Sequence, residues 1–352
     1  MSRIIDPEFD SHVRKLMAWH FDAATGSPFW LGKLDTLGFD PVTEVQGLDD
    51  LTRFPDVSSE LRSVPAQDLI PRGLADRPFR VYDSGGTTGS PKRIVDSAYR
   101  SQVTAWARQR LIACGVPADG NWLHLGPGGP HVIGFDTARY AALGGGVFYS
   151  VDLDPRWVKR LLADERGEEA EAYVQHLLDQ AETILESQDV AVLNTTPPLL
   201  AAICLRPRLY ELVRTKIRAI IWAGTSISTE NLKQLREVFF ADARVVGIYG
   251  NSLMGVAPQR PARPGDSHPC VFEPFPETTR LELVDENGEP VAYGERGRVR
   301  LQLVSEEMFL PNILERDTAI RVRPQEDSFV DGLADVQTYR SLDDVTIIEG
   351  VY

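Results

Sequence analysis

The chain contains few cysteines, and none of them are spaced as in a redox or metal site. Cys114, Cys204 and Cys270 form no CxxC pattern among the 352 residues, which fits a reduced protein better than a disulfide scaffold. The six histidines form no HxxxH or HExxH pair, so the sequence gives no support to a zinc site. Metal and disulfide chemistry are therefore not expected from these residues.

Basic residues and long apolar runs are also scarce. The 37 Lys and Arg residues are outnumbered by 51 Asp and Glu residues, giving a net charge of −14. Such a chain is poorly suited to nucleic acid, and any phosphate it binds must be held by a local site. No apolar run reaches the roughly 18 residues that span a bilayer. Asp6, Glu8 and Asp10 stand where a signal peptide would be apolar. We expect a cytoplasmic protein with no nucleic-acid or membrane partner.

Hydrophobic periodicity predicts the first elements. Residues 7–20 fit an amphipathic helix, and residues 79–83 fit a strand. A helix is expected over residues 97–114, with Ser97 as its N-cap and Gly115 just beyond its end. The apolar content of 43% is enough for a sizeable core.

The middle of the chain alternates strand and helix patterns, which predicts a parallel sheet covered by helices on both faces. The expected strands are residues 189–194, 217–224 and 244–250. The expected helices are residues 172–187, residues 198–214 with a break near Pro207, and residues 228–240 with Ser228 as the cap.

From about Thr278 the pattern changes to alternating runs around the turn signal "ENGEP", which predicts an antiparallel β-rich subdomain. The expected organisation is an α/β core over residues 1–277, the β-rich subdomain over 278–340 and a short tail over 341–352. The fold class is therefore α/β, with a small antiparallel part.

Three polar, glycine-containing loops follow the expected strands. They are "SGGTTGSPK" (84–92), "WAGTSIS" (222–228) and "YGNSLMG" (249–255). Ligands of open α/β sheets bind beyond the carboxyl ends of the strands, so these loops are expected to meet at one crevice.

The first of these loops suits a polyphosphate. Gly85, Gly86 and Gly89 let backbone N–H groups turn inward as an anion nest, and Lys92 adds a positive charge. Hydroxyl donors come from Ser84, Thr87, Thr88 and Ser90. An ordinary surface hairpin is the alternative interpretation. The Walker, GxGxxG and GxSxG patterns all fail on spacing, the second because His131 replaces the last glycine of "GPGGPH".

The segment 84–92 resembles the phosphate loop of the adenylate-forming (acyl-CoA synthetase, AMP-binding) superfamily. Other segments resemble the phenylacetate–CoA ligase branch in the same order, so that the similarity covers nearly the whole chain. These segments are residues 27–41, 48–62, 129–148, 222–228, 249–255 and 294–304. The resemblance implies the large N-terminal domain of that fold. It also implies ATP-dependent conversion of a carboxylic acid to an acyl-adenylate, with release of pyrophosphate.

The resemblance also implies roles for individual residues. Lys92, Thr87 and Ser252 would be the catalytic residues, with Ser252 on the α-phosphate. The nucleotide would be held by Ser84, Gly85, Gly86, Thr87, Thr88, Gly89, Lys92, Ala223, Gly224, Thr225, Tyr249, Gly250, Asn251, Ser252 and Asp317. Asp317 would accept hydrogen bonds from the ribose. The acid pocket would contain His131, Phe135 and Trp222.

Each of these positions also has a plain structural interpretation. Tyr249 and Trp222 fit core aromatics, and Asp317 fits a solvated turn beside Arg316. Ser252 fits a helix cap, and Asn251 fits an ordinary turn residue. His131 fits a satisfied loop histidine, and Phe135 fits a core phenylalanine.

Two departures from the family pattern bear on activity. Leu253 occupies the position of the family's magnesium-binding glutamate, and leucine cannot ligate a hard cation. ATP and Mg²⁺ are thus the implied cofactors, with no protein ligand for the metal at this position. Residues 341–352 resemble the family hinge, and the resemblance implies that the mobile C-terminal domain with its lysine is absent. Lys92 does not replace that lysine, so a complete CoA ligase is not expected from this chain alone.

Three functions remain open from the sequence. The chain adenylates an acid, binds nucleotide or aryl acid without turnover, or is one half of a split ligase. In the last case its partner would be a separate lysine-bearing domain or an acyl-accepting protein. Small relatives in specialised-metabolite pathways, such as the tailoring of phenazine-type antibiotics, favour an aromatic acid as the small-molecule substrate.

Overall fold

The computed structural model describes residues 6–84, 90–326 and 328–339. Contacts divide the chain into two compact units. Unit 1 consists of Met1–Val103, Ser252–Gly255 and Glu273–Tyr339. Unit 2 consists of Thr104–Asn251, Val256–Phe272 and Arg340–Tyr352. The domain bounds expected at residues 277 and 340 stay a prediction.

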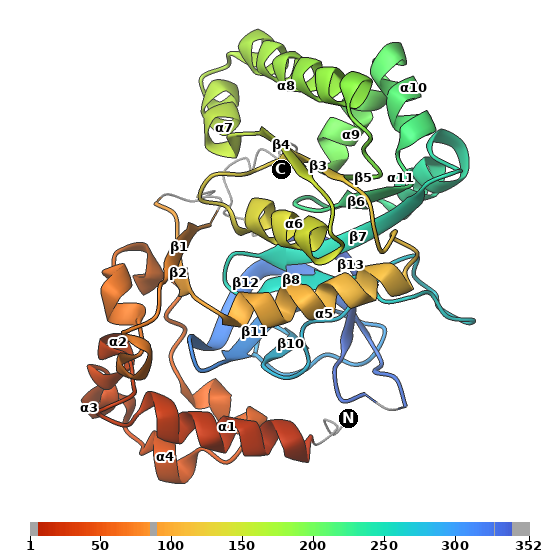
Figure 1. The fold of residues 1–352 in the computed structure, drawn as a ribbon. Coiled ribbons are helices and arrows are strands. Elements are labelled where there is room, and N and C mark those ends of the chain that lie inside the picture. Colours follow the sequence, from red (N-terminus) through yellow and green to blue (C-terminus); the bar gives the residue numbers. More distant parts are fainter. Residues whose placement is uncertain (1–5, 85–89, 327, 340–352) are drawn as a thin grey trace. The chain divides into compact units, whose positions relative to one another are not determined.

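The N-terminal part of unit 1 is built from one long helix and a series of short ones. The predicted helix over residues 7–20 is confirmed as α1 (Pro7–His20), whose first turn is capped by the Asp6 carboxylate accepting from the Phe9 N–H at 3.0 Å. The short elements that follow are α2 (Pro28–Leu31), α3 (Leu34–Leu37), α4 (Pro41–Glu44), η1 (Leu48–Arg53), η2 (Glu60–Arg62), η3 (Ala66–Leu69) and η4 (Arg72–Leu74) (Figure 1). A hairpin of β1 (Arg80–Asp83) and β2 (Arg93–Asp96) ends this part.

An aromatic cluster joins these short helices to the antiparallel sheet of unit 1. The rings of Trp30 and Phe54 each lie 5.0 Å from the ring of Phe309, and all three side chains are buried. The Trp30 indole N–H also donates to the Phe309 carbonyl at 2.9 Å. The packing of these rings holds the short helices against the core of unit 1.

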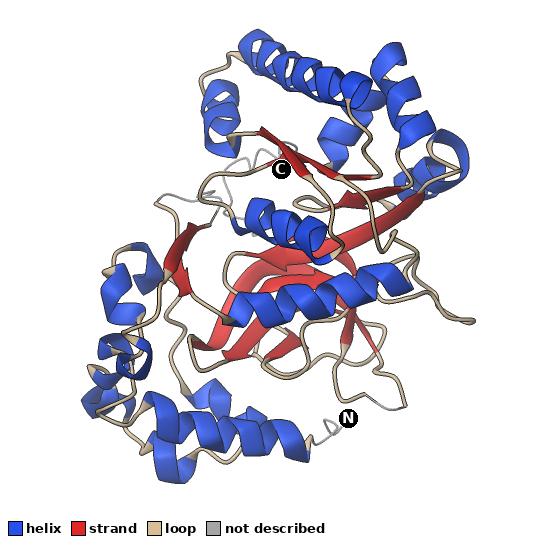
Figure 2. Cartoon of the chain, in the orientation of Figure 1, coloured by secondary structure: helices blue, strands red, loops and turns tan. Residues whose placement is uncertain are grey.

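The predicted antiparallel region is confirmed. In that sheet β10 (Thr279–Val284), β11 (Arg296–Val304), β12 (Phe309–Val322) and β13 (Gly332–Thr338) lie in sequence order (Figure 2). The turn after β10 forms where "ENGEP" predicted it. The Asp285 carboxylate accepts from the Asn287 and Glu289 N–H groups at 2.8 and 2.9 Å, and Gly288 has a φ of +80°.

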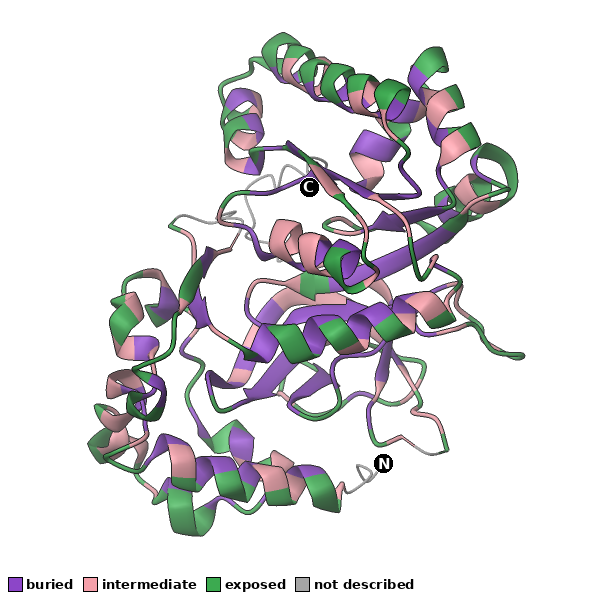
Figure 3. Cartoon of the chain, viewed as in Figure 1, coloured by how far each residue is buried: buried purple, intermediate pink, exposed green. Residues whose placement is uncertain are grey.

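The predicted parallel sheet is also confirmed, in unit 2. Its strand order is β4-β3-β5-β6-β7-β8, and the pairs β3–β4, β3–β5, β5–β6 and β6–β7 are parallel. The strands are β3 (Trp122–Gly126), β4 (Phe148–Asp152), β5 (Val192–Thr195), β6 (Ala219–Trp222), β7 (Arg244–Asn251) and β8 (Gly255–Pro258). Every residue of β3, β5 and β6 is buried (Figure 3), as expected for strands covered on both faces. A short strand, β9 (Val271–Phe272), bridges to Gln259.

The helices agree with most of the predicted starts and stops. They are α5 (Tyr99–Ala113), α6 (Val132–Leu143), α7 (Pro155–Ala163), α8 (Gly167–Ser187), α9 (Pro197–Cys204), α10 (Pro207–Lys216) and α11 (Thr229–Gln234), the last continued by the π-helical turn η5 (Leu235–Phe239). The break at Pro207 is confirmed, and the Ser228 hydroxyl accepts from the Asn231 N–H at 3.1 Å, as its cap role predicted. In contrast, α8 starts five residues earlier than expected.

The predicted cap of α5 is wrong. Ser97 does not cap this helix, which begins at Tyr99. The carboxylate of Glu307 instead accepts from the N–H groups of Ser97, Ala98 and Tyr99 at 2.8, 2.6 and 3.0 Å. A carboxylate beside a helix N-terminus satisfies several unpaired N–H groups at once. Because this carboxylate is about 210 residues away in sequence, no local pattern could have predicted it.

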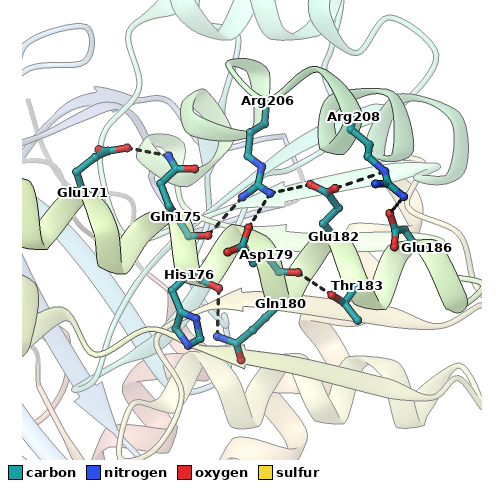
Figure 4. A network of polar contacts seen from close by, with 10 residues as sticks. All are labelled: Glu171, Gln175, His176, Asp179, Gln180, Glu182, Thr183, Glu186, Arg206 and Arg208. Atoms are coloured by element: carbon teal, nitrogen blue, oxygen red, sulfur yellow. Dashed lines mark hydrogen bonds and ion pairs between the residues drawn. The ribbon is translucent and has the colours of Figure 1, made fainter.

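An ion-pair network on the surface of unit 2 joins α8 to α10. Arg206 contacts the carboxylates of Asp179 and Glu182 at 2.7 and 2.9 Å, and Arg208 contacts Glu182 and Glu186 (Figure 4). Within the described residues, no helix combines the length and hydropathy needed to cross a membrane.

Candidate active site

The hairpin of β1 and β2 frames the segment that resembles a phosphate loop. Beyond the last ladder pair, Asp83 with Arg93, the Ser84 N–H donates to the Lys92 carbonyl at 2.9 Å, and the Lys92 N–H donates to the Ser84 hydroxyl at 2.8 Å. The two ends of the segment are therefore fixed to each other. The predicted nucleotide residues Gly85, Gly86, Thr87, Thr88 and Gly89 lie outside the described residues.

Ser252 lies directly against this hairpin. Its hydroxyl donates to the carbonyl of Asp83 at 3.1 Å, one residue before the segment begins. It does not cap a helix, because it lies in the turn that follows β7. Ser252, a predicted site residue, is thus in contact within unit 1 with the residue that directly precedes Ser84, about 170 residues away in sequence.

Arg100 holds the hairpin and the Ser252 turn together. Its side chain is 1% exposed, pairs with Asp96 of β2 at 3.8 Å and lies 5.4 Å from the ring of Tyr82 of β1. It also donates to the carbonyl of Ser252 at 3.4 Å. Gly255 follows with a φ of +90°, and a Cβ there would approach the Arg100 guanidinium to 2.6 Å. A buried guanidinium therefore fixes the geometry around the candidate site.

Asp317 lies on a strand and not in a solvated turn. It belongs to β12 and is opposite Thr338 of β13. Two residues earlier on the same strand, Glu315 is buried. Burial raises the pKa of Glu315 to about 7, although Lys92 acts in the opposite direction. The carboxyl therefore titrates near neutral pH beside the hairpin lysine.

In unit 2 the predicted aromatic residues pack on one another. The Trp222 ring is 6.0 Å from the Phe272 ring, which is 6.2 Å from the Tyr249 ring. Trp222 also covers Gly247, where a Cβ would meet its ring at 2.7 Å. The Trp222 indole N–H is buried and has no hydrogen-bond partner among the described residues. These aromatics are core residues of unit 2.

The loop after β6 has the backbone freedom that its sequence suggested. Ala223 remains attached to the sheet, because its N–H donates to the Thr195 carbonyl at 3.2 Å. Gly224 follows with a φ of +92°, which other residues rarely adopt. The buried Thr225 hydroxyl has no partner within the described part of the chain. Gly250 and Asn251 stand at the carboxyl end of the neighbouring strand β7.

His131 and Phe135 flank the start of α6. His131 precedes the helix and is buried, and its N–H donates to the Gly128 carbonyl at 3.0 Å. Phe135 lies one turn later on the same helix face. On β3, the ring of His124 lies 2.9 Å from the Asn194 side-chain oxygen and 3.0 Å from the Pro127 carbonyl. Burial lowers the pKa of His124, which keeps this imidazole neutral at pH 7.

A separate cavity of about 670 Å³ lies within unit 1. Its lining includes Phe9, Tyr99 and Arg280 but none of the predicted site residues. Arg280 is paired with Asp6 and stacks 3.7 Å from the Phe9 ring centre. Because its buried charges pair with each other, we place the candidate active site at the motif residues and not here.

Comparisons with known proteins identify the fold. No protein-family model matches the sequence, and no curated protein matches it significantly. Solved structures of 2-hydroxyisobutyryl-CoA ligase do match. One, in complex with 2-HIB-AMP and CoA in the thioesterification state, has a TM-score of 0.67 at 15% identity, covering 97% of this chain and 69% of that chain. An open conformation with the same ligands has a TM-score of 0.65 at 15% identity, covering 97% and 71%.

The chain has the adenylate-forming fold. An ATP-bound RpMatB-BxBclM chimera also matches, with a TM-score of 0.50 at 14% identity, over 74% of this chain and 47% of that chain. The fold predicted from the sequence is thus confirmed. The narrower resemblance to the phenylacetate–CoA ligase branch stays a prediction.

A protein-held magnesium ion does not fit the adenylate-forming fold as this chain builds it. Leu253 is 4% exposed beside the equally buried Met254, so the expected ligand position is apolar. Among the described residues, no group of three or more His, Cys, Asp or Glu side chains could hold a metal ion. No catalytic step is therefore assigned to a metal bound by these residues.

Sequence reasoning missed several buried polar residues of α5, of which Arg100 contacts the candidate site. Arg100, Thr104 and Arg108 are all buried and recur every four residues along α5. A polar stripe at this spacing beside the apolar stripe was visible in the sequence. The capping carboxylate of Glu307 and the buried carboxyl of Glu315 left no comparable local signal.

Proposed function

We propose that the protein adenylates a carboxylic acid with ATP. An oxygen of the acid forms a bond to the α-phosphorus, the bond from that phosphorus to the β-phosphate bridge breaks, and pyrophosphate leaves with the electron pair. One observation carries the proposal beyond the shared fold. The Ser252 hydroxyl touches the residue that precedes the phosphate-loop-like segment, so the predicted α-phosphate and polyphosphate positions adjoin.

The residues of this chain would act mainly by positioning and by neutralising charge. Lys92 offsets the charge of the leaving pyrophosphate, together with the hydroxyls of Thr87 and Thr88. Ser252 donates to the α-phosphate once it turns from the Asp83 carbonyl. Asp317 accepts from the ribose hydroxyls. The adenine-side residues are Ala223, Gly224, Thr225, Tyr249, Gly250 and Asn251.

We propose a planar aromatic acid as the substrate, in a specialised-metabolite pathway of the phenazine-type antibiotic kind. Support comes from the aromatic rings of His131, Phe135 and Trp222, since aromatic side chains pack favourably on a planar ring. ATP is the nucleotide of this proposal.

The decisive experiment is ATP–pyrophosphate exchange with a panel of aromatic and aliphatic acids. Exchange with at least one acid is expected. Ser252→Ala should lower kcat/KM about 10- to 100-fold, since a hydrogen bond to a charged group contributes about 1.5–3 kcal/mol. Ser63→Ala, which changes an exposed serine elsewhere in unit 1, is the matched control. Failure of this protein to bind ATP under any condition would contradict the proposal.

A second candidate function is binding without turnover, and the buried Leu253 favours it. Tight ATP or aryl-acid binding in calorimetry, with no exchange for any acid, would select it. A third is a split ligase, in which a lysine-bearing domain comes from another polypeptide. Full activity that appears only after such a polypeptide is added would select that arrangement.

A further inference from the structure

Glu315 is a buried carboxyl without an evident structural task. Its side chain is 7% exposed, and its Oε1 atom has no hydrogen-bond partner among the described residues. Its main-chain carbonyl accepts from the Arg298 Nε–H at 2.7 Å. Burying a carboxyl with an unsatisfied oxygen costs stability unless a role compensates for it.

The charges around Glu315 come from four segments of unit 1. Lys92 directly precedes β2, Asp317 follows Glu315 by two residues on β12, and Arg298 lies on β11. Asp56 accepts from the Leu314 N–H at 3.1 Å. Lys92 and Arg298 favour the ionised carboxylate, and burial, Asp317 and Asp56 favour the neutral acid. The protonation state of Glu315 therefore changes when one charge nearby is added or removed.

We propose that Glu315 is a proton-linked partner of Lys92, neutralising the ammonium when no nucleotide is bound and taking up a proton when phosphates bind there. This inference rests on the proposed function only in placing a nucleotide's phosphates at Lys92. Bound phosphates add negative charge near Glu315. They also interact with the Lys92 ammonium, which then stabilises the Glu315 carboxylate less. Both changes raise the pKa of Glu315 from a starting value of about 7. By linkage, ATP binds more tightly as the pH falls, and Glu315 is a positioning residue that regulates Lys92.

The test is ATP affinity measured by calorimetry between pH 6 and 9, in wild type and in Glu315→Gln. Glutamine mimics the neutral acid at every pH. The ratio of the wild-type Kd to the variant Kd should be near one at pH 6 and rise to about tenfold at pH 9, if binding raises the pKa by about one unit. Titration of ATP itself cancels in this ratio.

Proton uptake gives a second readout that needs no variant. At pH 8 the terminal phosphate, with a pKa of about 6, is already ionised. Wild-type binding in buffers of different ionisation enthalpy should therefore show uptake of a fraction of a proton. Zero uptake overturns the inference even if Glu315→Gln fails to fold.

Glu282→Gln is the matched control, because it removes a carboxylate from the same sheet that is already paired with Arg300 and Gln302. It should keep the wild-type pH dependence. An equal pH dependence in wild type and Glu315→Gln overturns the inference and leaves the proposed function intact. Absence of ATP binding by all three proteins overturns the proposed function instead.

Discussion

Two arginines, one in each unit, show how differently similar ion pairs contribute to this molecule. Arg100 in unit 1 pairs with Asp96 at 3.8 Å, and both side chains are at most 3% exposed. Arg206 in unit 2 pairs with Asp179 at 2.7 Å, and these side chains are 26% and 64% exposed (Figure 4). The longer pair is the more important one, because burial and not distance sets the cost of breaking an ion pair.

The largest expected effect is that of Arg100→Met. The substitution leaves a buried carboxylate at Asp96 without this ion pair and removes the donor to the Ser252 carbonyl. Breaking a buried pair from one side typically costs about 3–5 kcal/mol of unfolding free energy. Urea unfolding should show a lower midpoint with an unchanged slope. A loss below about 1 kcal/mol would mean that burial does not control the contribution of this pair.

The comparison of buried and exposed charged groups extends to His20, whose burial makes stability depend on pH. Burial lowers the pKa of His20 to about 4, and its Nε2 atom lies 2.7 Å from the Ser305 carbonyl. The unfolded chain, with a histidine pKa near 6.5, binds this proton first as the pH falls. Stability is therefore complete above about pH 6.5 and lost towards pH 4, by up to about 3 kcal/mol.

The control is His20→Gln, whose amide keeps a donor near the Ser305 carbonyl and does not titrate. Unfolding free energies of the two proteins should be compared from pH 7 to pH 4.5. Wild type should lose about 2 kcal/mol more than the variant over this range. Parallel curves would show that His20 is not buried in its neutral form.

The fold was predictable because its signals are local and repeated. Apolar strands alternating with amphipathic helices define the parallel sheet, and period-two alternation around "ENGEP" defines the antiparallel one. Pro207 starts a helix and Ser228 caps one, and both affect only backbone groups a few residues away. Their effects were therefore visible in the sequence. In contrast, the N-cap of α5 depends on Glu307, which only the tertiary structure brings to the helix.

The candidate site, like the fold, has parts that the sequence could predict and parts that it could not. The loop of residues 84–92 and the Ser252 turn could be found because backbone freedom and hydroxyl groups have a recognisable pattern. Their contact, through the Asp83 carbonyl, could not be derived from either segment alone. The burial of the Glu315 carboxyl could not be derived from its own segment for a related reason. A charged residue in a sequence is normally assigned to the surface, and only the fold shows which ones are enclosed.

The smallest expected effect is that of Arg206→Met, the same substitution as at Arg100 but on the surface. The substitution removes the contacts of Arg206 with Asp179, Glu182 and the Gln175 carbonyl. Water replaces the contact at Asp179, which is 64% exposed, and Arg208 stays 3.5 Å from the half-enclosed Glu182 carboxylate (Figure 4). Exposed pairs contribute about 0.2–1 kcal/mol, and salt screens them further. The unfolding midpoint should therefore shift little, and less still at 0.5 M NaCl. A loss matching that of Arg100→Met would contradict the comparison, because it would mean that the α8–α10 network, and not burial, stabilises its part of the chain.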